Sequence, residues 1–533
     1  MNFKKTINIR LIFATLAGLL LFNACVDKND WDVDSSYSRM FRPANLAVTG
    51  VTATTADVNF VAIPGSAYYL VELSQDSLVF ESIVATLDTT ANQFTLQNLE
   101  SNSPYSIRVQ AISADASKPS SAWSELYFNT RAEQIMEPVL PGDIMSRSVN
   151  LRWTAGATVT NLQILDGDGT EVMNLAISAE TMAAGSLKVT GLSPETSYTA
   201  VLLNGTKQRG SATFTTYPDV PDADLLFMME ATDVLTQETF DTLTVSSVTF
   251  AFPAGTYYNF SETLQLPTDV AFNFFGLPGD TKAILNIKQI NMGTNHEYIK
   301  FINLDVTGMV YENGVPTGAV YDYLFNQSDE ATVGSIEFSN CLIRDLGRTP
   351  LRLQGSGSNK YIGLVKIDNC LVYNMPDSYY FINSNVSTCQ MANISITNST
   401  FHNIMRMIMH TNSNNESLVI SDCTFNNVLA SGRYFIDMST SYGPTSEFKI
   451  TNSIFGDTAD DNARGIRAAS APVVTNTFAT SDFVLGGSSI SGLIDYLGLS
   501  TDLFADPANG DFTIKDELFD GKSSAGDPRW RFQ

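Results

Sequence analysis

Short stretches in which apolar and polar residues alternate follow one another along most of the chain, and they predict strands. Beyond Pro218 no segment of useful length has apolar residues at the spacing of an amphipathic helix. One pattern recurs there instead: apolar-x-apolar-x-Asn/Asp-small-x-apolar-x-Asn/Asp. It occupies residues 336–345, 365–374, 394–403, 418–427 and 448–457. The first Asn or Asp positions, from 340 to 476, are separated by 29, 29, 24, 30 and 24 residues. Such periods are typical of a solenoid, so residues 218–533 are predicted to form a right-handed parallel β-helix.

The repeated Asn and Asp positions are predicted to form columns, because parallel strands stack about 4.8 Å apart. The first column is expected to be an internal ladder made of Asn340, Asn369, Asn398, Asp422 and Asn452. Asn tolerates the left-handed backbone that such corners need. A second column comprises Asp345, Asn374, Asn403, Asn427 and Asp457. The residues that follow the first column are small and are expected to be buried core: Cys341, Cys370, Ser399, Cys423 and Ser453.

Two β-sandwiches are predicted before the β-helix, over residues 43–131 and 134–217. Each span has short strands at spacings of about 8 to 12 residues. A Leu, a short turn and then a Tyr in an alternating strand occur at Tyr105 and again at Tyr198. This element resembles the tyrosine corner of fibronectin type III domains, in which the Tyr hydroxyl bonds to the backbone. Trp153 occupies the expected early-strand core position of the second copy, and Phe60 that of the first. Such domains mostly serve as spacers or protein-binding modules. In the second one, residues 166–169 (DGDG) are interpreted as a hairpin turn rather than a calcium loop.

The start of the chain has the features of an export signal. Lys4, Lys5 and Arg10 precede an uncharged run over residues 11–22, which is too short to span a bilayer. The run ends near Cys25, and this arrangement resembles a bacterial lipoprotein signal. That resemblance implies a signal peptide at 1–24, lipidation of Cys25 and an acidic tether at 25–42 like that of Bacteroides surface lipoproteins. Ordinary cleavage beside an unrelated Cys is the alternative.

Composition narrows the choice of function. The 533 residues include 31 Lys and Arg against 56 Asp and Glu, a net charge of −25. Such a charge excludes nucleic acid as a partner, because binding to its backbone needs a basic surface. Five Cys are too few for a disulfide scaffold, and three His leave little room for a His-rich metal site. No cofactor is expected.

Further segments of the last part resemble known β-helix proteins. Residues 252–257 (FPAGTY) and 270–277 (VAFNFFGL) resemble the opening of pectin-lyase-like proteins, and residues 503–512 and 525–530 resemble the closing segment of Bacteroides surface lipoproteins. The resemblance implies a C-terminal segment that caps the last coil. It also implies a β-helix of unassigned function that occurs alongside carbohydrate-uptake proteins, which are therefore expected partners.

Catalytic motifs of β-helix enzymes are largely missing. The paired carboxylate motifs of polysaccharide hydrolases are absent, and residues 348–352 (RTPLR) match the pectate-lyase Arg motif only weakly. A lyase of the alginate or chondroitin type, with a Lys and an Arg on neighbouring coils, stays open. Calcium is expected as a cofactor only if the protein is a lyase.

Arginines and tyrosines instead gather on successive coils. Between residues 335 and 470 there are 10 Lys and Arg against 11 Asp and Glu, which is close to neutral in an acidic chain. Alignment of the coils places Arg348 with Arg406, and Arg352 with His410. Guanidinium groups pair with uronate carboxylates, and aromatic faces stack on sugar rings. The predicted carbohydrate-binding residues are Arg348, Arg352, Tyr379, Tyr380, Arg406, His410, Arg433, Tyr434 and Arg467. The alternative is that these arginines are ordinary solvent-facing residues.

The sequence therefore predicts an all-β, secreted protein that is lipid-anchored to the outer membrane and faces outward, with two fibronectin-like sandwiches before a β-helix. The first functional hypothesis is binding of an acidic extracellular polysaccharide without turnover. The second is a polysaccharide lyase using Arg348, Arg352, Arg406 or His410. The third is a structural or protein-docking surface component.

Overall fold

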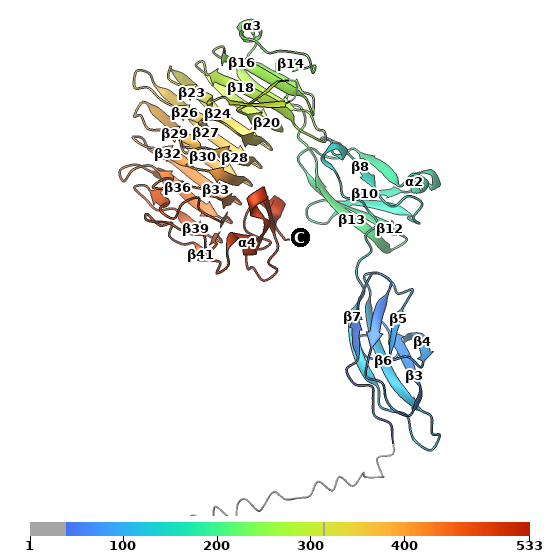
Figure 1. Ribbon diagram of the computed structural model, residues 1–533. Coiled ribbons are helices and arrows are strands. Elements are labelled where there is room, and N and C mark those ends of the chain that lie inside the picture. The colour runs from blue at the N-terminus through green and yellow to red at the C-terminus, as the bar shows by residue number, and fades with distance from the viewer. Residues whose placement is uncertain (1–38, 313–314, 533) are drawn as a thin grey trace, which may run out of the picture.

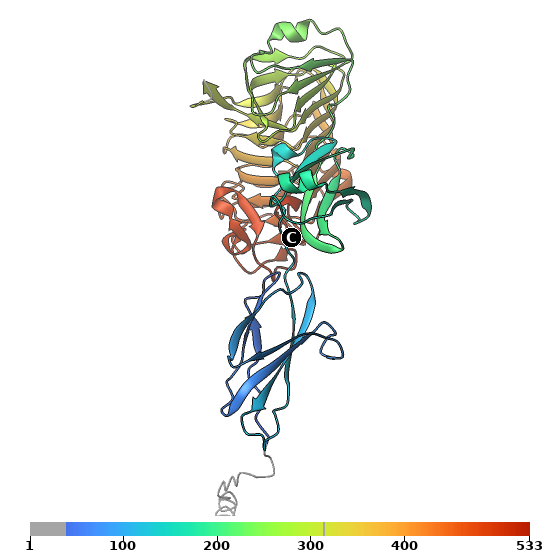
Figure 2. The same cartoon turned by 90° about the vertical axis from the view of Figure 1, so that its right-hand side faces the viewer.

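The computed structural model describes residues 39–312 and 315–532. The predicted signal peptide and the predicted lipidation site Cys25 lie outside these described residues. Almost all of the structure is β: two sandwiches precede a long parallel β-helix, and the second sandwich lies alongside that helix (Figures 1 and 2). Within the described part of the chain, no helix is long and apolar enough to cross a membrane.

The first sandwich packs a three-stranded antiparallel sheet on a four-stranded one. The smaller sheet consists of β1 (Ala47–Thr49), β2 (Ala56–Asn59) and β5 (Gln93–Leu96). The larger consists of β4 (Ile83–Thr89), β3 (Ser66–Ser74), β6 (Pro104–Ser113) and β7 (Ser124–Asn129). Phe60 is buried in the core between them. The Tyr105 hydroxyl accepts a hydrogen bond from the Glu100 backbone N–H at 2.9 Å, which is the geometry of a tyrosine corner.

The second sandwich repeats this plan with one strand fewer. Tyr198 forms the corner by accepting from the Ser193 N–H at 3.0 Å, and Trp153 is buried in the core. This sandwich also contains a short helix α2 (Ala179–Ala184) and a 3-10 turn η1 (Pro141–Asp143). The two sheets are β8 (Ser148–Arg152) with β11 (Ser186–Thr190), and β10 (Glu171–Ala176), β9 (Asn161–Leu165), β12 (Ser197–Asn204) and β13 (Lys207–Thr215).

The loop at residues 166–169 is a hairpin turn between β9 and β10. Asp166 accepts hydrogen bonds from the backbone N–H groups of Asp168 and Thr170 at 3.1 and 2.8 Å. Its carboxylate therefore caps the turn, which confirms the hairpin interpretation.

The β-helix has three parallel faces. Its first face consists of β14 (Leu225–Met228), β15 (Ser247–Phe252), β17 (Ala271–Gly276), β19 (His296–Ile302), β24 (Ala331–Ser339), β27 (Lys360–Asp368), β30 (Cys389–Thr397), β33 (Asn415–Ser421), β36 (Pro444–Thr451) and β39 (Val473–Thr475). The second face consists of β20 (Leu304–Thr307), β25 (Leu342–Arg344), β28 (Leu371–Met375), β31 (Thr400–Ile404), β34 (Thr424–Asn426), β37 (Ile454–Phe455), β40 (Phe478–Ala479) and β41 (Ile494–Asp495).

The third face carries the predicted arginines. It consists of β23 (Tyr323–Gln327), β26 (Thr349–Leu353), β29 (Ile382–Ser384), β32 (Ile408–His410), β35 (Tyr434–Asp437) and β38 (Arg464–Arg467). β18 (Ala283–Asn291), which pairs with β16 (Tyr257–Gln265), joins the second and third faces, because its first half pairs with β20 and Ile290 pairs with Phe325. A hairpin of β21 (Met309–Glu312) and β22 (Val315–Val320) branches off beside it.

Equivalent side chains of successive coils stack inside the helix. Phe250, Phe274, Phe301 and Phe338 form a row whose neighbouring ring centroids are 5.8, 4.9 and 5.0 Å apart. Phe240 of α3 (Gln237–Asp241) packs on this row at the N-terminal end. The predicted stack of small residues is confirmed, since Cys341, Cys370, Ser399, Cys423 and Ser453 are all buried. The four cysteines of the described chain are free thiols.

The Asn columns lie at two corners of the helix. All five residues of the first column have positive φ, between 49° and 57°. They are not internal, which corrects the sequence prediction: Asn369 is exposed and the others are partly exposed. The left-handed corner turns their side chains outward, and the following small residue fills the interior.

The partners of the two columns also differ. In the second column Asn374 Nδ2 donates to Asp345 Oδ1 at 2.8 Å, and Asn403 Nδ2 donates to Asn374 Oδ1 at 3.1 Å. Asn427 continues this amide ladder by donating to Asn403. The first column is held partly by the end of the chain, because Arg529 donates to Asn369 Oδ1 at 2.7 Å.

The C-terminal segment covers the side of the helix, including the side of its last coils, as Figure 1 shows in red, and Phe519 packs on Phe478 of β40 with ring centroids 4.8 Å apart. Phe512 lies against His402 of the second face, and Trp530 Nε1 donates to Thr400 Oγ1 at 2.8 Å. Residues such as Phe483 and Ile490 pack on the end of the core instead. The segment contains α4 (Ser500–Leu503), β42 (Phe504–Asp506), η2 (Pro507–Asn509), β43 (Asp511–Ile514) and η3 (Pro528–Trp530).

Candidate functional site

The strand register of the third face shows which predicted residues share a column. Asn326, Arg352, Asn383, Met409, Asp437 and Arg467 pair in succession through six strands. The predicted alignment of Arg352 with His410 is therefore wrong by one position. The turns between coils differ in length, so equal offsets from the Asn column do not mark equal positions. Arg348 and Arg406 do not align either. Leu351, Ile382 and Ile408 share one column, and Arg348 lies three residues before Leu351, whereas Arg406 lies two residues before Ile408.

The one-position shift removes His410 from the surface. Its side chain points inward and is fully buried, and its Nε2 lies 2.9 Å from Ser413 Oγ. Burial lowers the pKa of His410 to about 4, so the ring is neutral at physiological pH. It is a core residue and neither a carbohydrate ligand nor a base for a bound substrate.

Two arginines near the N-terminal end of the site lie between tyrosines of the neighbouring coils. The Arg352 guanidinium carbon is 4.2 Å from the ring centroid of Tyr379 and 5.9 Å from that of Tyr323. Arg348 lies 5.6 and 5.8 Å from the Tyr323 and Tyr379 rings, and it donates to the Tyr323 hydroxyl at 2.9 Å. Such stacking orients a guanidinium and leaves its N–H edge available.

The charge partners of these two arginines differ. Arg348 forms an ion pair with Asp322 at 3.1 Å. Arg352 has no carboxylate within 4.0 Å among residues 39–312 and 315–532, and donates only to Asn326 Oδ1 at 3.3 Å. Its side chain is partly exposed. Arg352 is therefore an oriented positive charge without a fixed anion.

Farther along, one carboxylate serves two arginines. Asp377 Oδ1 accepts from Arg406 Nε and, at 2.9 Å, from Arg433 Nε. Burial raises the pKa of Asp377, but the two guanidiniums outweigh that effect and leave the pKa lowered. Tyr380 beside them is buried, with the Arg406 guanidinium 5.8 Å from its ring centroid. It packs beneath the arginine and offers little surface to a ligand.

The last part of the site is built on Tyr434. Arg467 lies 4.5 Å from its ring centroid and binds Asp437 through two hydrogen bonds of 2.8 and 2.7 Å. Arg464 donates to the Tyr434 hydroxyl at 3.1 Å, and that hydrogen bond lowers the pKa of Tyr434. Arg464 has no ion pair within the described parts of the chain.

Together these side chains form a continuous band along the third face, which we call the Arg–Tyr strip. It holds six arginines but three aspartates, Asp322, Asp377 and Asp437, although the chain as a whole has a net charge of −25. Sequence reasoning missed Tyr323, Arg464 and the aspartates. Tyr323 could not be predicted from the repeat, because its coil has no clear Asn pattern. Arg464 could have been predicted, because it pairs with Tyr434 of the preceding coil. The strip consists of Tyr323, Arg348, Arg352, Tyr379, Tyr380, Arg406, Arg433, Tyr434, Arg464 and Arg467 with those aspartates.

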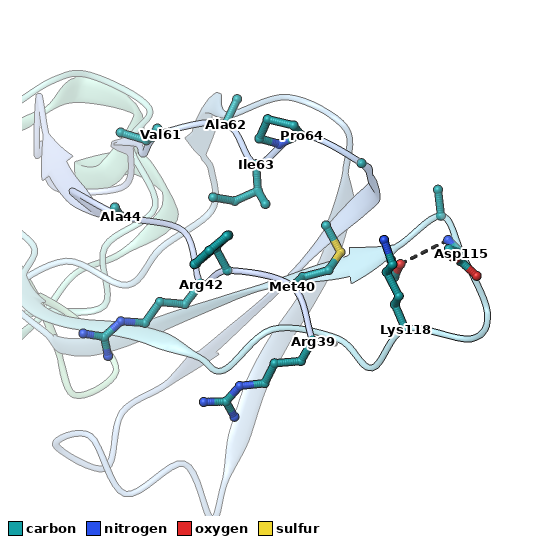
Figure 3. Close-up of a pocket in the computed structure, with 14 residues that line it drawn as sticks. Arg39, Met40, Arg42, Ala44, Val61, Ala62, Ile63, Pro64, Asp115 and Lys118 are labelled. Carbon is teal, nitrogen blue, oxygen red and sulfur yellow. Dashed lines mark hydrogen bonds between the residues drawn. The ribbon is translucent and has the colours of Figure 1, made fainter. Parts of the chain in front are cut away.

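Other features carry less chemistry. Within the described residues no group of three or more His, Cys, Asp or Glu could hold a metal ion. A hollow of about 860 Å³ lies at one end of the first sandwich, between the segment that enters it and two loops (Figure 3). Met40, Val61 and Ile63 give it an apolar wall, and Arg39, Arg42 and Lys118 lie at its rim. It contains no paired acid and base.

Comparison with protein families identifies two parts of the chain. Residues 41–126 match the fibronectin type III domain, which is the first sandwich. Residues 418–530 match a domain of unknown function, DUF5123. This second match begins in β33 and spans the last coils together with the C-terminal segment that packs on their side.

Three of the solved structures that are similar to this chain are β-sandwich proteins. A segment of two fibronectin type III domains from chicken tenascin is 16% identical, with a TM-score of 0.23, and the match covers 33% of this chain and 99% of the segment. A computationally redesigned β-sandwich is 29% identical (TM-score 0.15; 17% and 94% covered). The fibronectin type III domain of the human collagen α-1(XX) chain is 21% identical (TM-score 0.16; 18% and 90% covered). No curated protein matches the chain.

Proposed function

We propose that the Arg–Tyr strip binds an extracellular polysaccharide that carries carboxylates, such as a polyuronate, without turning it over. The observation that carries the proposal is Arg352, a partly exposed guanidinium held on the Tyr379 ring at 4.2 Å with no carboxylate of its own among the described residues. A uronate carboxylate would supply the missing anion by accepting two parallel N–H···O bonds.

The repeat of the β-helix suits a linear polymer. Successive strands lie about 4.8 Å apart, so the six strands of the third face offer binding groups over roughly 24 Å. Arg352 and Arg464 lie near opposite ends of this length, and Asp377 leaves one unneutralised charge between Arg406 and Arg433. Several carboxylates of one chain would thus meet positive charge in turn.

The location of the protein is part of the proposal. A lipid on Cys25 would hold it on the outer membrane, where the two sandwiches act as spacers that present the β-helix to the medium. Carbohydrate-uptake proteins are the partners that would receive the captured glycan.

Binding is tested by affinity electrophoresis of the protein in gels containing polygalacturonate, alginate or a neutral glucan. The unmodified protein is expected to be retarded by the two uronates and not by the glucan. Arg352→Ala should weaken that binding at least roughly tenfold, because a desolvated charge pair is worth about 1.5–3 kcal/mol. Arg131→Ala, which removes an exposed arginine of the first sandwich, is the matched control. Equal retardation of both variants and the unmodified protein would refute the assignment of the strip.

A uronate lyase is the second candidate, and Tyr434 is the observation that favours it. Tyr434 is 8% exposed, and its hydroxyl accepts a hydrogen bond from Arg464 that lowers its pKa, so this oxygen is the group that would remove the proton beside a uronate carboxyl group. The carbon–oxygen bond to the leaving sugar would then break, a carbon–carbon double bond would form, and the leaving oxygen would take up a proton. Ultraviolet absorbance of an unsaturated uronate that disappears in Tyr434→Phe would establish this activity. Binding without such absorbance supports the first candidate, and absence of both supports a structural or docking role.

A further inference from the structure

A second hollow of the β-helix lies on its second face, well apart from the Arg–Tyr strip. The C-terminal segment lies beside the β-helix there (Figure 1). Residues of this segment and of β28 and β31 enclose an opening of about 350 Å³. This volume is at the lower end of the range of small-ligand sites, about 300–1,000 Å³. One side is formed by outward residues of the two strands, and the other by the segment around Phe512.

The ten residues that line this hollow have no charged side chain at neutral pH, in a chain with a net charge of −25. Burial raises the pKa of Tyr373, which keeps its hydroxyl protonated, and burial lowers the pKa of His402, which keeps its imidazole neutral. Tyr373, Asn374, His402, Asn403 and Phe512 supply its polar and aromatic groups.

The walls combine aromatic surface with hydrogen-bonding groups. The Phe512 and His402 rings meet edge to face with centroids 5.4 Å apart, and Tyr373 pairs with His402 across the strands. Buried His402 Nδ1 has no hydrogen-bond partner among the described residues. At the rim, Asn374 and Asn403 each use one N–H in the amide ladder, so that each carboxamide keeps a second N–H.

From this arrangement we infer that the hollow binds one neutral sugar unit of a glycan. A sugar ring has an apolar face for the aromatic walls and hydroxyl groups that both donate and accept, which matches the amides, the Tyr373 hydroxyl and the neutral imidazole. The carboxylate of a uronate would lose its hydration in this hollow without gaining a cation among the lining residues, and such desolvation is unfavourable. The site therefore has a different preference from the Arg–Tyr strip, and this inference does not rest on the function proposed for the strip.

The hollow is rigid on both sides, which favours a preformed site. Asp527 of the C-terminal segment accepts from Thr400 Oγ1 at 2.7 Å, and Trp530 donates to the same hydroxyl. Phe512 is held by Phe504 and Trp530 at centroid distances of 5.4 and 6.0 Å. These contacts fix the segment over β31, so that binding of a sugar costs little conformational entropy.

The test is calorimetric titration of a protein comprising residues 39–532 with short neutral glucose- and galactose-based oligosaccharides. Ala508→Trp fills the hollow from an exposed position of η2, and Ala469→Trp places the same side chain on a distant exposed loop as control. We expect the unmodified protein and Ala469→Trp to bind at least one oligosaccharide equally, and Ala508→Trp to bind it at least about tenfold more weakly. Thermal unfolding of both variants verifies that they fold.

Two further variants keep the two sites apart. Tyr373→Phe, which removes only a hydroxyl, should weaken neutral-sugar binding, whereas Arg352→Ala should leave it unchanged. Ala508→Trp should in turn leave polyuronate binding unchanged. Failure of every neutral oligosaccharide to bind, or equal binding by Ala508→Trp and Ala469→Trp, would overturn the inference without affecting the proposal for the strip.

Discussion

The charge balance of the Arg–Tyr strip can be altered at one position without removing any arginine. Asp377 lies between Arg406 and Arg433 and is 40% exposed. Asp377→Asn keeps the shape of the side chain and an oxygen that accepts hydrogen bonds, but removes its negative charge. If the strip binds carboxylates, this variant should bind a polyuronate more tightly than the unmodified protein.

The size of the gain follows from the charges. A ligand carboxylate bound by either arginine would lie roughly 7 Å from the Asp377 carboxylate, where two like charges in water repel by about 0.6 kcal/mol. Removing that repulsion raises affinity roughly threefold, and more if the bound polymer excludes water. The cost in folding stability should be small, because ion pairs this exposed contribute up to about 1 kcal/mol each.

The assay is titration with a uronate oligosaccharide in about 0.01 M and then 1 M salt. The gain should be present at low salt and disappear at high salt, where the Debye length is about 3 Å. Because the pKa of Asp377 is lowered, its charge in the unmodified protein persists below the usual range for a carboxyl group. Asp88→Asn on the exposed edge of the first sandwich is the control. Weaker binding by Asp377→Asn at low salt would show instead that the carboxylate is needed to position the arginines.

Three further results are expected. Phe301→Ala should lower the free energy of unfolding of the β-helix by about 3–5 kcal/mol, as measured in denaturant, since its ring is buried between those of Phe274 and Phe338. His410 takes up a proton at its ordinary pKa of 6.5 when unfolded but near 4 when folded, so stability relative to His410→Gln should fall by up to about 3 kcal/mol as pH drops through this window. Asn403→Ala should destabilise the helix by about 1 kcal/mol per lost ladder bond, whereas Asn509→Ala at the exposed end of η2 should not.

Much of the β-helix could be predicted because its repeat has a physical cause. A corner with positive φ strongly favours Asn or Asp, so Asn340, Asn369 and their equivalents mark each coil in the sequence. The residue after the corner fills the interior and is small in the clearest coils, as Cys341 and Cys370 are, whereas buried Leu304 takes this place after Asn303. The tyrosine corners at Tyr105 and Tyr198 were recognisable for a similar reason, because one hydroxyl satisfies a specific backbone N–H.

The third face could be predicted only in part. Between the second Asn column and the next strand of the third face the coils insert different numbers of residues, and no Asn or Asp position repeats within these turns. A one-residue error in a strand reverses every side chain, which is why the sequence alignment places buried His410 beside partly exposed Arg352. The side position of the C-terminal segment depends on long-range contacts such as Asp527 to Thr400, and these leave no local pattern in the sequence.

We propose that Arg352 holds a carboxylate of an extracellular glycan, and a crystal structure of the protein with a short uronate oligosaccharide bound tests this directly. A uronate carboxylate is expected to accept two hydrogen bonds from the Arg352 guanidinium at about 2.7–2.9 Å, with Tyr379 still stacked behind it. A saccharide bound elsewhere, with Arg352 contacting only Asn326 and the tyrosines, would show that Arg352 is not the carboxylate-binding residue.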